Sequence, residues 1–108
     1  MKQYTDESQT AKLIELGFER PKMAAPKLKW VDGEPVFEPQ YTIVELIEML
    51  MTIKGVKISF EAMYGERLTL IVKRLVGDKW DILYGNVSKE LVGLLFDAIV
   101  KLKEEGVI

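Results

Sequence analysis

The spacing of apolar residues changes near position 56 and changes back near position 88, and this constrains the fold more than any other feature. In the outer parts of the chain, apolar residues recur every three or four positions, as on one face of a helix. Between them, apolar and polar residues alternate, as in strands that bury one face. The alternating sets are Val56, Ile58 and Phe60, then Leu68, Leu70 and Val72, then Trp80, Ile82 and Tyr84. This pattern predicts three antiparallel strands between helices.

The loops of this meander have to keep the three apolar sets on one face. A shift of one residue turns every side chain of a strand to the opposite face. A plain two-residue turn would break the alignment, so we expect an odd-length loop or a bulge near 64–66 and another near Gly77. With either device, all three sets face the core.

An earlier hairpin is indicated around Asp32 and Gly33, because this dipeptide favours a tight two-residue turn. Such a turn pairs Trp30 with Pro35 on one face. It places Leu28 opposite Phe37 on the same face. Proline has no N–H group to donate to a neighbouring strand, so the hairpin is expected at the edge of the sheet.

Three segments have helical spacing and matching end signals, at about 6–16, 42–51 and 88–102. Thr42 is expected to cap the second helix, and Glu45 completes a capping box with it. Ser88 is expected to cap the third helix. Gly17 and Gly106 suit the left-handed residue that ends many helices.

These elements predict an α+β fold in a single domain covering residues 1–108. The sheet is antiparallel with three to five strands, formed by the edge hairpin and the three-strand meander, and the three helices lie mainly on one face. The predicted core consists of the positions that satisfy these periods: Leu13, Ile14, Phe18, Leu46, Leu50, Ile58, Phe60, Leu70, Val72, Trp80, Ile82, Leu91, Leu95, Ala98, Ile99 and Leu102.

Composition removes most catalytic chemistries. The 108 residues include no cysteine and no histidine, which excludes disulfides, thiolate nucleophiles, imidazole bases and the usual ligands of zinc, copper and haem. The pairs Glu45 with Glu48 and Asp78 with Asp81 could divide acid and base roles or hold a hard cation. Helix capping and turn formation account for these acids more simply. We therefore predict no catalytic residue, no metal site and no cofactor.

The N-terminal residues and the apolar runs bear on where in the cell the chain is located. The opening residues 1–8 contain no apolar run that could act as a signal peptide. The longest apolar runs, such as Leu91 to Phe96, are far shorter than the roughly 20 residues that span a bilayer. A cytoplasmic protein without a membrane partner is predicted.

One basic segment is a candidate for nucleic-acid contact. Its cations precede an indole that could stack on a base. The residues are Arg20, Lys22, Lys27, Lys29 and Trp30. The alternative is a solvated loop with the indole packed in its own hairpin. Because the whole chain has a net charge of −2, nucleic acid is the less favoured partner.

The sheet face turned away from the helices is a candidate protein interface. Its expected residues are mostly charged or polar, namely Lys57, Ser59, Glu61, Arg67, Thr69, Lys73 and Asp81. Two aliphatic residues, Ile71 and Leu83, are expected among them, and Val107 with Ile108 adds apolar surface at the C-terminus. Scattered exposure of apolar residues is the alternative explanation. The occupant would be an unknown protein or a second copy of the chain.

Three stretches carry a resemblance, at 10–18, 41–50 and 101–108. Through them the chain resembles short uncharacterised proteins of gut anaerobic bacteria and their phages or mobile elements, among which the segment from Lys22 to Phe37 is variable. The matching stretches are helix ends and core faces. The resemblance implies a small bacterial or phage-encoded cytoplasmic protein and carries no activity or ligand with it.

The sequence therefore favours a non-enzymatic accessory or adaptor module that acts by protein–protein interaction. A nucleic-acid-binding accessory protein that uses the segment 20–30 is one alternative. A small enzyme that uses carboxylates is the other.

Overall fold

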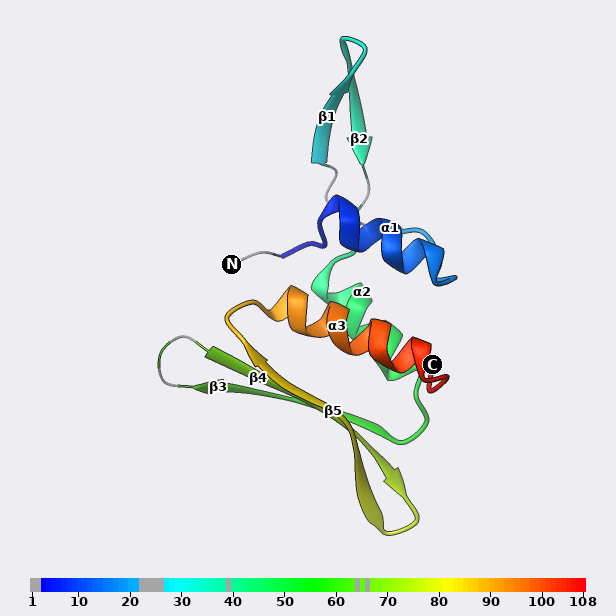
Figure 1. Ribbon diagram of the computed structural model, residues 1–108, viewed down its shortest axis with the longest axis vertical. Coiled ribbons are helices and arrows are strands. Elements are labelled where there is room, and N and C mark those ends of the chain that lie inside the picture. The colour runs from blue at the N-terminus through cyan, green and yellow to red at the C-terminus, as the bar shows by residue number, and fades with distance from the viewer. Residues whose placement is uncertain (1–2, 22–26, 39, 64, 66) are drawn as a thin grey trace.

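The computed structural model describes residues 3–21, 27–38, 40–63, 65 and 67–108, and it has the predicted α+β class. Helix α1 spans Glu7–Glu15, and strands β1 (Lys27–Val31) and β2 (Glu34–Glu38) follow it. Helix α2 spans Ile43–Met51. The meander consists of β3 (Val56–Met63), β4 (Arg67–Val76) and β5 (Lys79–Ser88), and α3 (Leu91–Glu104) ends the chain (Figure 1).

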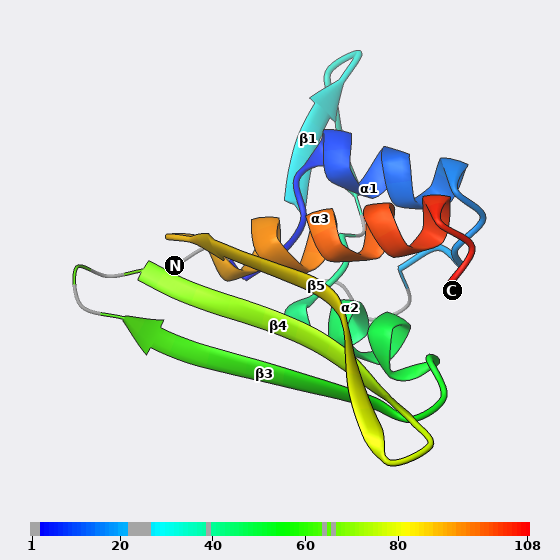
Figure 2. The same cartoon turned by 60° about the horizontal axis from the view of Figure 1, so that its bottom comes forward.

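The elements form layers on one side of the three-stranded sheet β3-β4-β5. Helices α2 and α3 cover one face of this sheet, and α1 lies beyond them on the side away from the strands (Figure 2). Strands β1 and β2 form a separate two-stranded sheet that projects from the body (Figure 1). The hairpin is therefore not the edge of the main sheet, which has three strands.

The β1–β2 hairpin has the predicted turn and register. Trp30 pairs with Pro35 and Leu28 pairs with Phe37. Asp32 has φ of +52° and Gly33 has φ of +79°. Positive φ at both central residues defines the type I′ turn, whose twist matches that of the flanking strands.

The first two helices begin with capping boxes. At α2, Thr42 Oγ1 accepts a hydrogen bond from the Glu45 backbone N–H at 3.1 Å, and Glu45 Oε1 accepts one from the Thr42 backbone N–H at 3.1 Å. This confirms the predicted pair. At α1, Asp6 and Gln9 form the same reciprocal arrangement, so each helix has two of its free N–H groups satisfied locally.

The predicted start of the third helix is wrong. Ser88 is the last residue of β5, where it pairs with Leu68, and α3 begins at Leu91 with Glu90 as its N-cap. The backbone of Ser88 belongs to the sheet and so cannot also start the helix. Its hydroxyl instead accepts a hydrogen bond from the Glu90 N–H at 3.3 Å.

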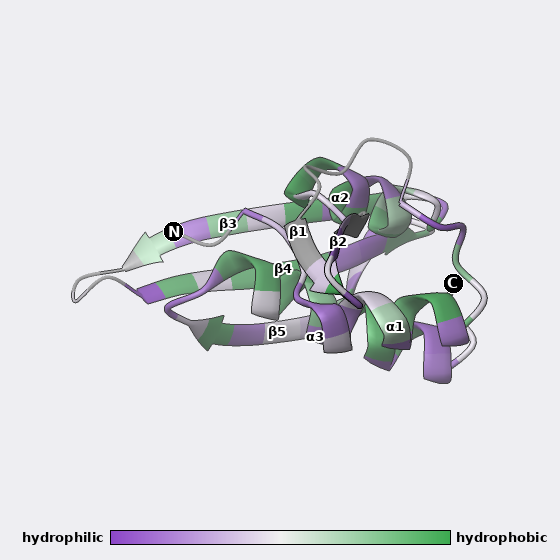
Figure 3. Cartoon of the chain, turned by 90° about the horizontal axis from the view of Figure 1, so that it is seen from above, coloured by the Kyte–Doolittle hydropathy of each residue, from purple (hydrophilic) through white to green (hydrophobic). Residues whose placement is uncertain are grey.

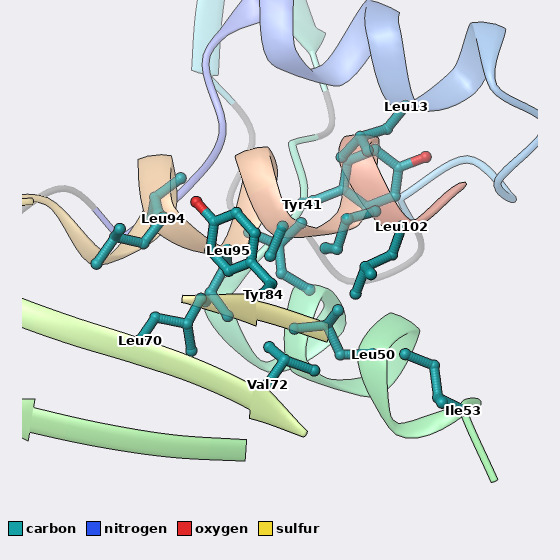
Figure 4. Close-up of a cluster of buried hydrophobic side chains, with 14 residues drawn as sticks. Leu13, Tyr41, Leu50, Ile53, Leu70, Val72, Tyr84, Leu94, Leu95 and Leu102 are labelled. Atoms are coloured by element: carbon teal, nitrogen blue, oxygen red, sulfur yellow. The ribbon is translucent and has the colours of Figure 1, made fainter. Parts of the chain in front are cut away.

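A single apolar core fills the space between the sheet and the helices. In Figure 4, Leu70 and Val72 of β4 point towards Leu95 of α3 and Leu50 of α2. The buried apolar residues are Leu13, Tyr41, Leu46, Leu50, Ile53, Leu70, Val72, Tyr84, Val92, Leu94, Leu95, Ala98, Ile99 and Leu102. Full burial of a leucine side chain contributes about 1.5–3 kcal/mol, so this cluster holds the layers together.

The two hairpins of the meander solve the register problem differently. Strands β3 and β4 pair Met63 with Arg67, which leaves a three-residue loop of the predicted odd length. Strands β4 and β5 pair Val76 with Lys79 across a plain two-residue turn. The register then shifts, because Val72 pairs with Tyr84 and Lys73 with Ile82. The extra residue is Leu83, so the bulge lies in the body of β5 and not near Gly77.

This bulge overturns part of the predicted core. Trp80 pairs with Leu75 and Ile82 pairs with Lys73, so both lie on the face away from the helices. Only Tyr84, beyond the bulge, returns to the core side, where it is buried. Phe60 is also wrongly predicted: it lies on the helix side opposite Leu70 but is half-exposed, because the end of β3 extends past the helices (Figure 2).

Candidate interaction face

The sheet surface opposite helices α2 and α3 is the candidate functional site, and we call it the open face. Alternating residues of each strand form it, and Figure 3 shows the corresponding bands of hydrophobic and hydrophilic colour along the strands. The open face consists of Lys57, Ser59, Glu61, Arg67, Thr69, Ile71, Lys73, Leu75, Trp80, Ile82 and Val87.

The apolar part of the open face is larger than the sequence indicated. Trp80 is 48% exposed and Ile82 is 68% exposed. Leu75, the partner of Trp80 in the register, is 45% exposed. Ile71 lies on the same face of β4 and is partly exposed. Three adjacent large apolar side chains therefore face solvent where β4 and β5 approach their turn.

The turn and the bulge together produce this surface. Gly77, with φ of +64°, is the first of the two turn residues, as in the type II′ hairpin turn. This turn sets the faces of Trp80 and Ile82, and the bulge at Leu83 restores the core register for Tyr84. A glycine–aspartate pair between two strands is the sequence signal that could have identified the turn. Bulges commonly redirect side chains in this way near functional sites.

Two lysines lie close to the indole of Trp80. The Nζ atom of Lys73 lies 5.2 Å from the ring centroid, and that of Lys57 lies 5.7 Å from it. Both distances are within the range of cation–π attraction, which contributes about 0.5–1 kcal/mol at exposed sites. The indole is therefore held on the open face by one charge from the adjacent strand β4 and one from β3 beyond it.

The charges of the open face are mainly positive. Lys57 and Lys73 are directly opposite each other in the register, an arrangement in which like charges repel. Arg67 adds a third cation, and Glu61 is the carboxylate of the set. In the part of the chain that the structure describes, neither lysine forms an ion pair with a carboxylate.

The predicted interface residues are only partly on this face. Ile71 lies on it, as expected. Leu83 does not, because it is the bulged residue and packs against the core. Asp81 is also displaced, since it pairs with Arg74 and forms an ion pair with that residue at 3.6 Å.

The C-terminal residues fold back onto α3. The backbone N–H of Val107 donates to the Leu102 carbonyl oxygen at 2.9 Å, and Gly106 has the predicted left-handed conformation with φ of +76°. Both Val107 and Ile108 pack partly against the core. Much of their apolar surface is thus buried against the rest of the chain.

The basic segment is divided between two places. Arg20 is exposed beside α2, where it lines a groove, and Trp30 is 65% exposed in the projecting hairpin. Lys27 and Lys29 belong to β1. Lys22 lies outside the described residues.

The groove next to Arg20 contains one of the carboxylate pairs. It has a volume of about 540 Å³ and lies between α2, the residues after α1 and Ile108. Glu45 and Glu48 both line it, and Glu45 is held in its capping box. The hydroxyl of Tyr41 donates to the Glu19 carbonyl there. Burial, and secondarily the charge of Glu45, raises the pKa of Tyr41, so this phenol is neutral at physiological pH.

Among the described residues, no three acidic side chains come together in a group able to hold a metal ion. The helices in this part of the chain are too short, or too polar, to cross a bilayer.

Comparison with known proteins gave no match, whether with family models, curated proteins or solved structures.

Proposed function

We propose that the chain is a non-enzymatic interaction module that binds another protein through its open face. The observation that carries this proposal is the two-residue turn at Gly77, which places Trp80 and Ile82 on the solvent side of the sheet, while the bulge at Leu83 returns Tyr84 to the core. Aromatic residues are enriched at the centres of protein interfaces, where they bury large areas. Trp80, flanked by Ile82 and Leu75, has the composition of such an anchor.

A second copy of the chain is the less favoured partner. A two-fold dimer uses the same patch on both subunits, so the patch has to be complementary to itself. Lys57, Arg67 and Lys73 would face one another across such an interface, with Glu61 as the opposing charge on each side. A foreign partner that acts with the chain in the cytoplasm fits this surface better.

Capture of partners from cells that naturally express the chain tests the proposal. Ile82→Lys should abolish the capture of a protein that the parent chain retains, because burying an unpaired ammonium in an apolar contact is strongly unfavourable. Val44→Lys is the matched control. Val44 is an equally prominent apolar residue, 63% exposed, but it lies on α2.

The comparison of these two variants is decisive. Loss of the captured protein with Ile82→Lys and its retention with Val44→Lys would support the open face as the binding surface. A partner lost with Val44→Lys and retained with Ile82→Lys would move the site to α2 and contradict the proposal.

A further inference from the structure

We infer that the partner of the open face presents an acidic segment, in which a carboxylate flanked by apolar side chains lies between Lys57 and Lys73. This inference rests on the proposed function and specifies the chemistry of the partner. Its basis is charge complementarity at one point of the sheet, where two cations and an exposed indole meet.

The positions of the two lysines favour an anion. They are directly opposite each other on adjacent strands, and both Nζ atoms approach the same ring, at 5.2 and 5.7 Å from its centroid. Like charges in directly opposed positions destabilise a sheet. A carboxylate between them would remove this repulsion and form hydrogen bonds with both ammonium groups. Binding of an acidic segment would thus relieve this repulsion.

The neighbouring residues favour apolar side chains on either side of that carboxylate. Ile82 is the register partner of Lys73, and Leu75 is the register partner of Trp80. These exposed side chains next to the lysines cannot pair with charged groups. An occupant with apolar residues beside its acid would cover them, which contributes about 25 cal/mol for each Å² of apolar surface removed from water.

The same surroundings disfavour a nucleic acid as the occupant. A phosphate backbone requires a row of cations along its path, whereas Ile82 and Leu75 border the lysine pair on the open face. The protein as a whole has a net charge of −2, which repels a polyanion away from the immediate site. A protein segment with few charges avoids this repulsion.

The two tryptophans provide an internal test. Trp80 lies on the open face and Trp30 in the projecting hairpin, and they are the only tryptophans in the sequence. Their indole N–H groups give separate signals in a ¹H–¹⁵N correlation spectrum, which can be assigned with Trp30→Phe. The probe is a short, end-blocked peptide in which leucine alternates with glutamate. Its controls are the leucine–glutamine and leucine–lysine peptides and an oligothymidylate.

The leucine–glutamate peptide should shift the Trp80 signal and leave the Trp30 signal in place. The leucine–glutamine peptide should bind about tenfold more weakly, as expected for the loss of one charge-assisted contact. Binding of the acidic peptide should weaken as salt is added. Equal binding of the acidic and the amide peptides, or no shift of Trp80 with either, would overturn the inference. A larger Trp80 shift with oligothymidylate would assign the face to nucleic acid instead.

Lysine variants test whether Lys57 and Lys73 cause the preference for the acidic peptide. Lys57→Gln combined with Lys73→Gln should abolish the difference between the acidic and amide peptides, while Lys89→Gln, which removes an exposed lysine outside the open face, should preserve it. Lys57→Glu with Lys73→Glu should reverse the preference towards the leucine–lysine peptide. If the preference persists in both double variants, the two lysines are not its source and the inference is wrong.

These results are separable from a failure of the proposed function. If Ile82→Lys abolishes partner capture but the double lysine-to-glutamine variant retains it at full strength, the open face is an interface whose partner is not acidic at this point. If capture is insensitive to Ile82→Lys, the proposed function itself fails.

Discussion

Thr5 connects the N-terminal segment to the body of the protein through one buried hydroxyl. Its Oγ1 accepts a hydrogen bond from the Tyr41 backbone N–H at 3.0 Å and lies 2.7 Å from Thr10 Oγ1. The Thr10 hydroxyl in turn donates to the Asp6 carbonyl oxygen at 2.7 Å. The start of α1 and the residue before the α2 cap are thereby held together.

Thr5→Val keeps the shape of this side chain and removes its hydrogen bonds. The variant should lose about 1–3 kcal/mol of folding free energy, because the buried N–H of Tyr41 loses its acceptor. Denaturant unfolding measures this loss. Thr52→Val, which removes an exposed hydroxyl at the end of α2, should remain within about 0.5 kcal/mol of the parent. Equal stability of both variants would show that the Thr5 contact is not part of the folded state.

Asp97 of α3 makes folding dependent on pH. Although much of its side chain is exposed, partial burial raises the pKa of this carboxyl above its ordinary value. The carboxyl therefore holds its proton more tightly in the folded state than in the unfolded state. It favours folding most at acid pH, and it opposes folding once it is ionised in both the folded and the unfolded chain. Asp97→Asn should raise the melting temperature at neutral pH, and this gain should disappear below the ordinary pKa of aspartate. A gain that is the same at every pH would contradict this account.

At the scale of the elements, local chemistry made the helix ends and one hairpin predictable. Thr42 and Glu45 form their capping box within four residues of chain, and Asp32 with Gly33 determines a turn from its own backbone preferences. Neither feature depends on distant contacts. This is why both could be identified from the sequence alone.

Strand β5 could not be predicted in the same way. Alternation placed Trp80, Ile82 and Tyr84 on one face, but the bulge at Leu83 divides them between two faces. A two-residue turn followed by a bulge returns apolar residues of β5 to the core face, as an odd-length loop would. Which of the two arrangements forms depends on how β5 pairs with β4. The positions of Lys57, Lys73 and Ile71 on the open face were predictable because their strands carry no shift between β3 and β4.

Two truncations compare a residue of α3 with one of β5. Leu95→Ala should cost about 2–5 kcal/mol, because Leu95 is fully buried and its loss leaves a cavity. Ile82→Ala should change the stability by well under half of that amount, since its side chain faces solvent. Thermal unfolding of the two variants measures both values. A similar loss for Ile82→Ala would place this residue in the core, as its alternation with Tyr84 suggested, and would contradict the bulge.

At the scale of the whole molecule, the helices all lie on one side of the sheet and the hairpin projects away from it (Figure 2). The sequence predicted that the helices lie on one face of the sheet. It also placed the hairpin at the edge of the main sheet, which is wrong. Its pairing signals determine which residues of β1 and β2 meet, and they contain no information about which sheet the pair adjoins. The open face is a consequence of this arrangement, because every helix is used on the other side.

The central claim is that Trp80 is exposed on the open face close to two cations, and fluorescence quenching tests it most directly. In the Trp30→Phe variant all tryptophan emission comes from Trp80. The emission should be that of a solvent-exposed indole, and the ratio of iodide to caesium quenching should exceed that of the neutral free indole N-acetyltryptophanamide, because Lys57 and Lys73 attract anions and repel cations. Adding Lys57→Gln and Lys73→Gln should lower this ratio towards the value for the free indole. Blue-shifted emission that neither ion quenches would place Trp80 in the core and contradict the account.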